Sequence, residues 1–158
     1  MKRSLSIKFL ALTLMLLLGS VAVTATERPF SANGTGIAVP IIDDNGNIVG
    51  AKPTGSGNAT HLGLFTNTGE VSFTPDANNP TILHPSGGGV FTAANGDKLN
   101  FVIVSGALDL TTGIGTGDFA FTGGTGRFAN ATGHTSGVIQ QNVVTGAYEL
   151  TLVGNIDY

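Results

Sequence analysis

Residues 121–133 have the sequence Phe-Thr-Gly-Gly-Thr-Gly-Arg-Phe-Ala-Asn-Ala-Thr-Gly, which contains four glycines. Before this stretch, residues 118–121 alternate with a period of two, and after it polar and small residues lead into Gly-Val-Ile-Gln at residues 137–140. Such alternation is typical of β-strands, and glycine supplies the positive φ angles that a tight corner needs. The stretch therefore predicts a turn that joins two strands.

The Gly-Gly-x-Gly run within this stretch also invites comparison with a phosphate-binding loop, in which freed backbone N–H groups hold anionic oxygens. A nucleotide loop of this kind must open a helix and end in Lys-Ser or Lys-Thr. No apolar pattern of helical spacing follows Gly126, and the Lys-Ser/Thr ending is missing. The sequence therefore favours a structural corner over a nucleotide site.

The segment Gly-Gly-Thr-Gly-Arg-Phe at residues 123–128, followed by Ala131 and Gly133, resembles a segment of the barrel shared by plant allene oxide cyclases and dirigent proteins. Small secreted bacterial proteins expected to form this barrel have the same pattern, and the likeness covers roughly residues 58–158. The resemblance implies a barrel that acts without a cofactor. In allene oxide cyclases it encloses a fatty-acid epoxide and steers ring closure, and in dirigent proteins it orients phenoxy radicals. No catalytic residue is assigned, because the shared motif is a structural corner.

The N-terminus has the organisation of a signal peptide. Three basic residues among the first eight precede an apolar run at residues 9–18. About ten apolar residues are too few to span a bilayer, and the small residues that follow allow cleavage after Ala22 or Ala25. We therefore expect a signal peptide at residues 1–25 and one secreted or periplasmic domain at residues 26–158, with no membrane association after cleavage.

Composition narrows the class of protein further. The chain has no cysteine, so a lipoprotein anchor and disulfides are excluded, which favours a bacterial exported protein that is stable from its core alone. Ten acidic residues oppose only Arg28, Lys52, Lys98 and Arg127 outside the leader, so nucleic acid is not an expected partner. The 24 glycines recur between alternating apolar runs, as in a multi-stranded antiparallel sheet.

The alternating runs predict an all-β fold, a single antiparallel β-barrel of about eight strands. Closure into a barrel removes exposed edges and leaves room for side chains or one small ligand, and a β-sandwich is the alternative. Loops are expected at residues 52–57 and 75–88. The expected strands lie at residues 30–39, 61–66, 70–74, 89–93, 97–105, 108–110, 114–121, 135–143 and 148–157, with turns at Asn45-Gly46, Thr68-Gly69, Gly113, Gly124 and Gly146.

One hairpin decides the register of the core. A three-residue turn with Gly96 in the left-handed conformation places Phe91 opposite Leu99, whereas a two-residue turn places it opposite Asn100 and mixes the two faces. The first register is preferred because it collects the large apolar side chains on one face. The face expected to point inward comprises Phe91, Leu99, Phe101, Ile103, Phe119, Phe121, Tyr148, Leu150 and Leu152.

The residues expected to contact a ligand are Arg127, Phe128, His84, Phe101 and Tyr148. His84 is chosen because the loop expected at residues 75–88 is the longest irregular stretch, and such loops often bind ligands. Phe128 is expected to plug the end of the barrel. Arg127 could hold a carboxylate in bidentate fashion, or it could satisfy corner carbonyls or pair with Asp118.

No metal site is expected. His61, His84 and His134 lie more than twenty residues apart, so they lack the spacing of a metal motif. The run from Asp43 to Asn47 alternates like a calcium loop, but it lacks the glycine and the bidentate glutamate that such a loop requires. It is better explained as a hairpin turn.

Three functional hypotheses remain open. The first is a non-catalytic barrel that binds a small apolar ligand or serves as an extracellular structural module. The second is a cyclase, isomerase or dirigent-like guide that shapes its substrate, with a carboxylate such as Glu70 or Asp118 near the mouth. The third is an adhesion module whose threonine-rich outer faces contact polysaccharide. A cavity with a polar group inside favours the second and a filled interior the third; assembly into a homo-oligomer is left open.

Export is expected to remove the leader. Mass spectrometry of the exported protein should show a mature chain that starts at Val23 or Thr26. A mature form that retains Met1 would contradict the assignment of the leader.

Overall fold

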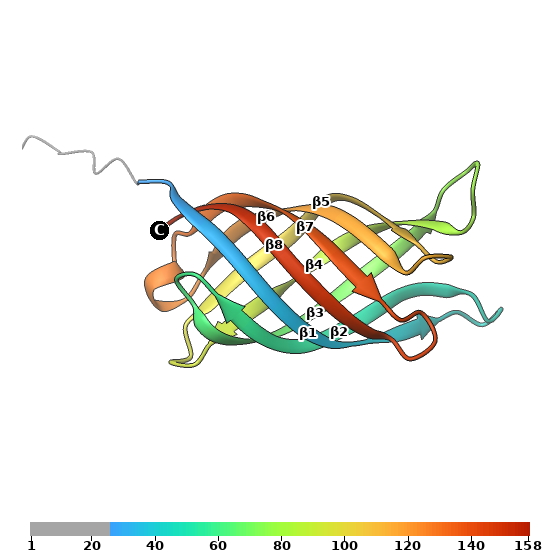
Figure 1. Cartoon of the computed structure of the whole chain (residues 1–158), viewed down its shortest axis with the longest axis horizontal. Coiled ribbons are helices and arrows are strands. Elements are labelled where there is room, and N and C mark those ends of the chain that lie inside the picture. The colour runs from blue at the N-terminus through green and yellow to red at the C-terminus, as the bar shows by residue number, and fades with distance from the viewer. Residues whose placement is uncertain (1–25) are drawn as a thin grey trace, which may run out of the picture.

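The computed structural model describes residues 26–158, and these form one closed antiparallel barrel of eight strands (Figure 1). Each strand pairs with its neighbours in the sequence, and the last strand closes the barrel against the first. The predicted barrel is confirmed and the β-sandwich is excluded. The strands are β1 (Arg28–Ile42), β2 (Ile48–Ala59), β3 (Gly63–Pro75), β4 (Ile82–Ala93), β5 (Lys98–Asp109), β6 (Ile114–Gly124), β7 (Thr132–Gln141) and β8 (Ala147–Asp157).

The predicted signal peptide lies outside the described residues. Within residues 26–158, no helix is long and apolar enough to cross a membrane. The only helical element there is a single 3-10 turn, η1 (Gly126–Phe128), which follows β6 at the predicted glycine corner.

The predicted register of the core hairpin is confirmed. Phe91 of β4 pairs with Leu99 of β5, and Gly96 has a φ of 88° in the turn between them. Both side chains are buried, and Phe101 packs against the same core. Side chains therefore alternate between the barrel interior and the outer surface, as the period of two requires.

Two expected loops are instead parts of strands. Residues 52–57 lie in the middle of β2, and residues 82–88 belong to β4, so that only residues 76–81 form the connection. The prolines are tolerated because Pro53 lies where the pairing of β2 with β3 skips two residues, and Pro85 lies where the register of β4 with β5 shifts. Proline has no backbone N–H to donate, so gaps and bulges in a ladder are where it fits.

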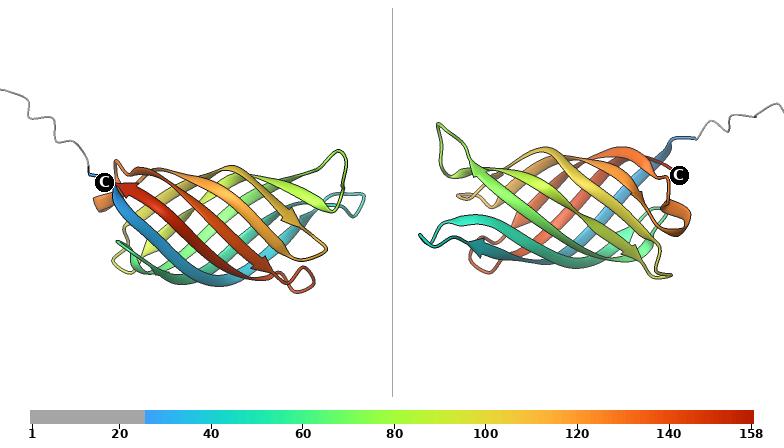
Figure 2. Two further views of the ribbon diagram at one scale, coloured as in Figure 1. Left: turned by 45° about the horizontal axis from the view of Figure 1, so that its top comes forward. Right: turned by 180° about the vertical axis from the view of Figure 1, so that it is seen from behind.

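The strands are also longer than predicted. The hairpin expected at Thr68-Gly69 is a continuous strand, β3. Residues 108 and 109 end β5 instead of forming a separate strand, and residue 110 begins the turn that follows. Figure 2 shows these long strands crossing the barrel obliquely. Gly69 lies within this strand at an inward position. Any side chain there would come too close to the backbone of Gly88, so this glycine marks close packing and not a turn.

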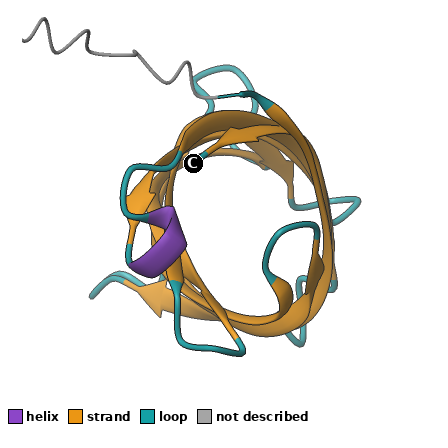
Figure 3. Ribbon diagram, turned by 90° about the vertical axis from the view of Figure 1, so that its left-hand side faces the viewer, coloured by secondary structure: helices purple, strands orange, loops and turns teal. Residues whose placement is uncertain are grey.

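The core falls into two parts along the barrel. The larger cluster surrounds η1, and there Phe128 is completely buried and packs 5.1 Å from the ring of Tyr158. The smaller cluster comprises Ala38, Ala51 and Tyr148, and it lies toward the opposite end. Figure 3 shows η1 at the rim of the first end, where the predicted plug, Phe128, is located. We call this the η1 end and the opposite one the loop end.

The corner depends on glycine conformation. Gly123 and Gly126 have φ angles of 89° and 58°, whereas Gly124, expected to form the turn, is the last residue of β6. A Cβ at Gly124 would collide with the carbonyl oxygen of Lys98, and one at Gly126 would contact the carboxylate of Asp97. Gly124 therefore has no room for a side chain. Gly126 also has no room, and in addition its φ angle favours glycine.

Replacing Gly126 by Val should lower the free energy of unfolding by ~1–3 kcal/mol, because the side chain forces a left-handed residue against Asp97. Gly46→Val is the matched control: Gly46 has a φ of 85° but nothing within 4 Å of an added Cβ. Denaturant unfolding should show a larger loss for Gly126→Val than for the control. Equal losses would mean that the contact with Asp97 contributes nothing.

Candidate functional site

The barrel contains a partly open cavity of about 120 Å³ in the half that extends toward the loop end. Its lining is almost entirely apolar and includes Val71, Phe73, Ile103, Ile139 and Leu150. The interior of an eight-stranded barrel is only wide enough for side chains or one small ligand. This barrel is filled with side chains at the η1 end and hollow in its other half.

Aromatic rings form the side of the cavity nearest the η1 end. Phe91 and Phe101 stack with ring centroids 4.7 Å apart, and Phe101 meets Phe119 edge to face at 6.0 Å. All three rings line the cavity, together with Phe121. Offset and edge-to-face contacts stabilise such a group beyond its buried area, so this wall is expected to hold its shape.

A polar pair, Tyr148 and Asn67, lies in the wall toward the loop end. Asn67 Nδ2 donates a hydrogen bond to Tyr148 Oη at 3.1 Å, and both side chains are buried. Burial raises the pKa of the Tyr148 hydroxyl, and the hydrogen bond from Asn67 offsets part of that rise. Among the described residues that line the cavity, Tyr148 is the only ionisable one, so the cavity is uncharged at neutral pH.

A second polar group, Thr135 of β7, lies in the same cavity wall. The residue is 2% exposed, and its Oγ1 has no hydrogen-bond partner among residues 26–158. Its neighbours in the ladder are Phe119 of β6 and Gly154 of β8, whose side chains offer no hydrogen-bonding group. Thr135 therefore presents an unpaired hydroxyl in otherwise apolar surroundings.

The structure separates the five predicted ligand residues into three places. Phe101 and Tyr148 both line the cavity, whereas Phe128 and Arg127 lie at the η1 end and His84 lies on the outer surface. The Nε atom of Arg127 is 3.6 Å from Asp97 Oδ2, and its guanidinium lies 4.9 Å from the centre of the Phe128 ring. The alternative pairing of Arg127 with Asp118 is therefore wrong.

The two carboxylates expected near the mouth face outward. Asp118 accepts hydrogen bonds from Ser105 Oγ at 2.9 Å and from Ser136 Oγ at 2.7 Å, on the outer surface of β5 to β7. Glu70 is exposed and lies 3.8 Å from the ammonium group of Lys52. Neither lines the cavity, so the structure gives no support to the expectation that one of them serves a substrate there from near the mouth.

Asn67 and Thr135 were not predicted from the sequence. Both are polar residues at inward positions of their strands, and only β3 has a clear alternation of polar and apolar side chains against which such a residue stands out. The inward position of Asn67 does not follow from the sequence prediction, because that prediction divides β3 into two strands and places residue 67 in the turn between them. For Thr135, one hydroxyl among many threonines is conspicuous only once the register is known.

No group of three or more metal-binding side chains is present in the part of the chain that the structure describes. In the calcium-like run, Asp43 Oδ1 accepts hydrogen bonds from the backbone N–H groups of Asn45 at 2.9 Å and Asn47 at 2.8 Å. The side-chain hydrogen bond from Asn47 lowers the pKa of Asp43 most, and the two backbone hydrogen bonds lower it further. The carboxylate therefore stabilises the hairpin turn, as the sequence predicts.

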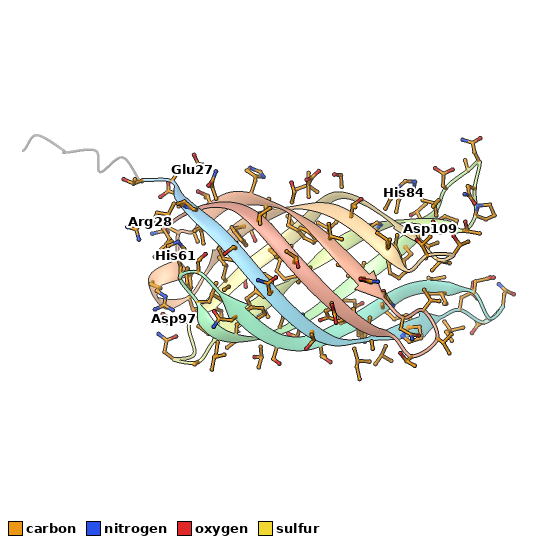
Figure 4. All side chains as sticks on the ribbon, viewed as in Figure 1. Glu27, Arg28, His61, His84, Asp97 and Asp109 are labelled. Atoms are coloured by element: carbon orange, nitrogen blue, oxygen red, sulfur yellow. The ribbon has the colours of Figure 1, made fainter. Side chains whose placement is uncertain are left out.

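His84 holds the loop at residues 76–81 against the barrel at the loop end (Figure 4). Its Nε2 lies 3.1 Å from Asp76 Oδ2, and its Nδ1 lies 3.1 Å from the carbonyl oxygen of Gly106. Both partners are acceptors, so the doubly protonated imidazolium satisfies both. These contacts raise the pKa of His84, and the hydrogen bond from His84 is the largest cause of the lowered pKa of Asp76.

No protein-family model and no curated protein matches the sequence. Solved structures do resemble the barrel, and two of them are dirigent proteins. The pterocarpan synthase dirigent protein GePTS1 aligns with a TM-score of 0.57 and 12% identity over 84% of this chain and 86% of that one. The pterocarpan synthase dirigent protein PsPTS1 aligns with a TM-score of 0.58 and 13% identity over 84% of this chain and 96% of that one. The likeness confirms the predicted dirigent-like barrel as a fold and transfers no activity.

The stability that the contact between His84 and Asp76 contributes should depend on pH, and it should be lost at both high and low pH. The raised pKa of His84 means that its contribution to stability is complete below its ordinary value of 6.5 and is lost as pH rises through the folded value. The lowered pKa of Asp76 means that its contribution is present above 3.8 and is lost as pH falls through the folded value. The loop should therefore be held best between these two ordinary values.

An NMR titration of the His84 ring checks this dependence. Asp76→Asn should lower the pKa of His84 toward 6.5, because the carboxylate is the largest cause of its rise. Asp109→Asn is the control, since Asp109 bonds to Thr111 and not to His84. An unchanged titration in Asp76→Asn would contradict the assignment.

Proposed function

We propose that the barrel binds one small, neutral, largely apolar molecule in its interior. The observation that supports this best is the cavity of about 120 Å³, whose lining carries no charge and is aromatic on one side. An apolar protein cavity of about 150 Å³ stays dry and binds benzene. The space here suits a molecule with one ring or a short chain, and a long fatty-acid chain would have to extend beyond it.

The absence of charge among the described lining residues limits the ligand further. An anion or cation in this cavity would lose its hydration without gaining an ionic partner, which costs far more than burying a neutral polar group. A neutral ligand meets an apolar wall together with hydrogen-bonding groups from Tyr148, Asn67 and Thr135. Secretion, which the leader sequence predicts, would place this binding outside the cytoplasm.

A second candidate function is stereochemical guidance of a reactive substrate, which a cavity with polar groups inside also favours. The dirigent fold and the neutral Tyr148–Asn67 pair support it, since a fixed hydrogen-bonding pair in a shaped cavity can orient a substrate without acid–base chemistry. A mechanism that requires an interior carboxylate has no support, because Glu70 and Asp118 face outward. The structural and adhesion hypotheses are less favoured, because they do not call for a hollow interior.

Toluene is a suitable probe of the proposed cavity. Its addition should shift the NMR signals of Phe101, Phe119 and Tyr148, which line the cavity, but not those of Phe128 at the η1 end. Saturable binding confined to the lining residues would support the proposal. The absence of shifts at these residues up to the solubility of toluene would contradict it.

Phe101→Ala tests the same cavity by enlarging it. Truncating a fully buried phenylalanine costs ~3–5 kcal/mol, but Phe101 already borders open space, so its loss should cost less and should favour a two-ring ligand over toluene. Phe128→Ala is the control in the filled half, and it should cost the full amount without changing ligand preference. Denaturant unfolding and ligand titration measure both effects. An unchanged ligand preference in Phe101→Ala would place the binding site elsewhere.

A further inference from the structure

We infer that Thr135 determines the specificity of the cavity, by forming a hydrogen bond with an oxygen of the ligand. The inference rests on the proposed function and deepens it by naming the ligand class. The class is a neutral single-ring molecule that bears one hydroxyl or carbonyl oxygen. Hydrocarbons of the same shape are expected to lack this additional contact.

The environment of Thr135 is the first step of the argument. Its side chain is buried, its Oγ1 has no partner among the described residues, and it borders the cavity. Buried polar groups in folded proteins nearly always have a hydrogen-bond partner. A valine would fill the same volume beside Phe119 without an unpaired hydroxyl. A polar group in this position is therefore better explained by a ligand than by packing.

The other polar residues of the cavity lining do not have this combination of burial and a missing partner. Gln141 and Thr116 are not buried. Tyr148 and Asn67 bond to each other, so each already has a partner. They also lie at a different level: Tyr148 pairs with Gln141, which is six residues beyond Thr135 on β7. A single-ring ligand whose oxygen meets Thr135 would therefore rest its ring near Phe119 and the stacked Phe101.

Phenol and toluene are matched probes, because they share one ring and differ in the hydroxyl group. The ratio of their dissociation constants isolates the effect of the hydroxyl group on affinity, because the ring contributes equally to both. This ratio should be measured in the intact protein and in the variants Thr135→Val and Thr135→Ser. Thr135→Val should shift the ratio by about tenfold against phenol, the size expected for losing one buried hydrogen bond. Thr135→Ser, which keeps the hydroxyl, should restore the ratio. Thr66→Val, on the exposed face of β3, should leave it unchanged.

Thermal unfolding without ligand separates a binding role from a structural one. Thr135→Val should unfold at the same or a higher temperature, since the hydroxyl that it removes has no partner. A marked loss of stability would show that the hydroxyl serves the fold, and an unchanged phenol-to-toluene ratio would show that it does not contact the ligand. Either result would overturn the inference while toluene binding still supports the proposed function. Failure of both probes to bind the cavity of the intact protein would overturn both.

Discussion

The barrel depends on inward-facing glycines that make room for aromatic side chains. A Cβ at Gly36 would lie 2.6 Å from Tyr148 Oη, and one at Gly55 would lie 2.7 Å from the same atom. At Gly89 a Cβ would approach the Phe101 ring to 2.9 Å. Real Cβ atoms essentially never come this close, so these side chains can contact the wall here only because it has no side chains at these positions. In so narrow a barrel, the glycines therefore decide how much of the interior stays open.

The two halves of the barrel use this space differently. At the η1 end Phe128 fills the interior. There His61 also links the start of the first strand to the C-terminal residue. Its Nε2 lies 3.0 Å from the carbonyl of Pro29, so Nε2–H donates and Nδ1 accepts from the Tyr158 hydroxyl at 3.1 Å. These bonds hold His61 at a φ of 67°, which is uncommon for a residue with a side chain. In the other half Tyr148 lies along the wall, and the cavity remains.

The sequence allowed the fold class, the core register and the plug to be predicted, because period-two alternation and the turn at Gly96 depend on local interactions. Strand lengths were harder, since glycine and proline mark turns in most chains but here serve inward packing and ladder gaps, as at Gly69 and Pro53. The site was predicted in part. Phe101 and Tyr148 were identified by their face, whereas the hydroxyl of Thr135 gains meaning only from neighbours on two other strands.

The distribution of charge limits the chemistry that this barrel can perform. The carboxylates of Asp118, which binds two serines, and of Asp76, which holds His84, lie outside, while the described cavity wall contains only neutral groups. An acid–base reaction would need a proton carrier inside, and the pKa of Tyr148, the only ionisable candidate there, is raised by burial. The hydroxyl is therefore protonated at neutral pH and able to donate a hydrogen bond. The neutral interior is therefore consistent with the proposed selection of a ligand by shape and by neutral hydrogen bonds.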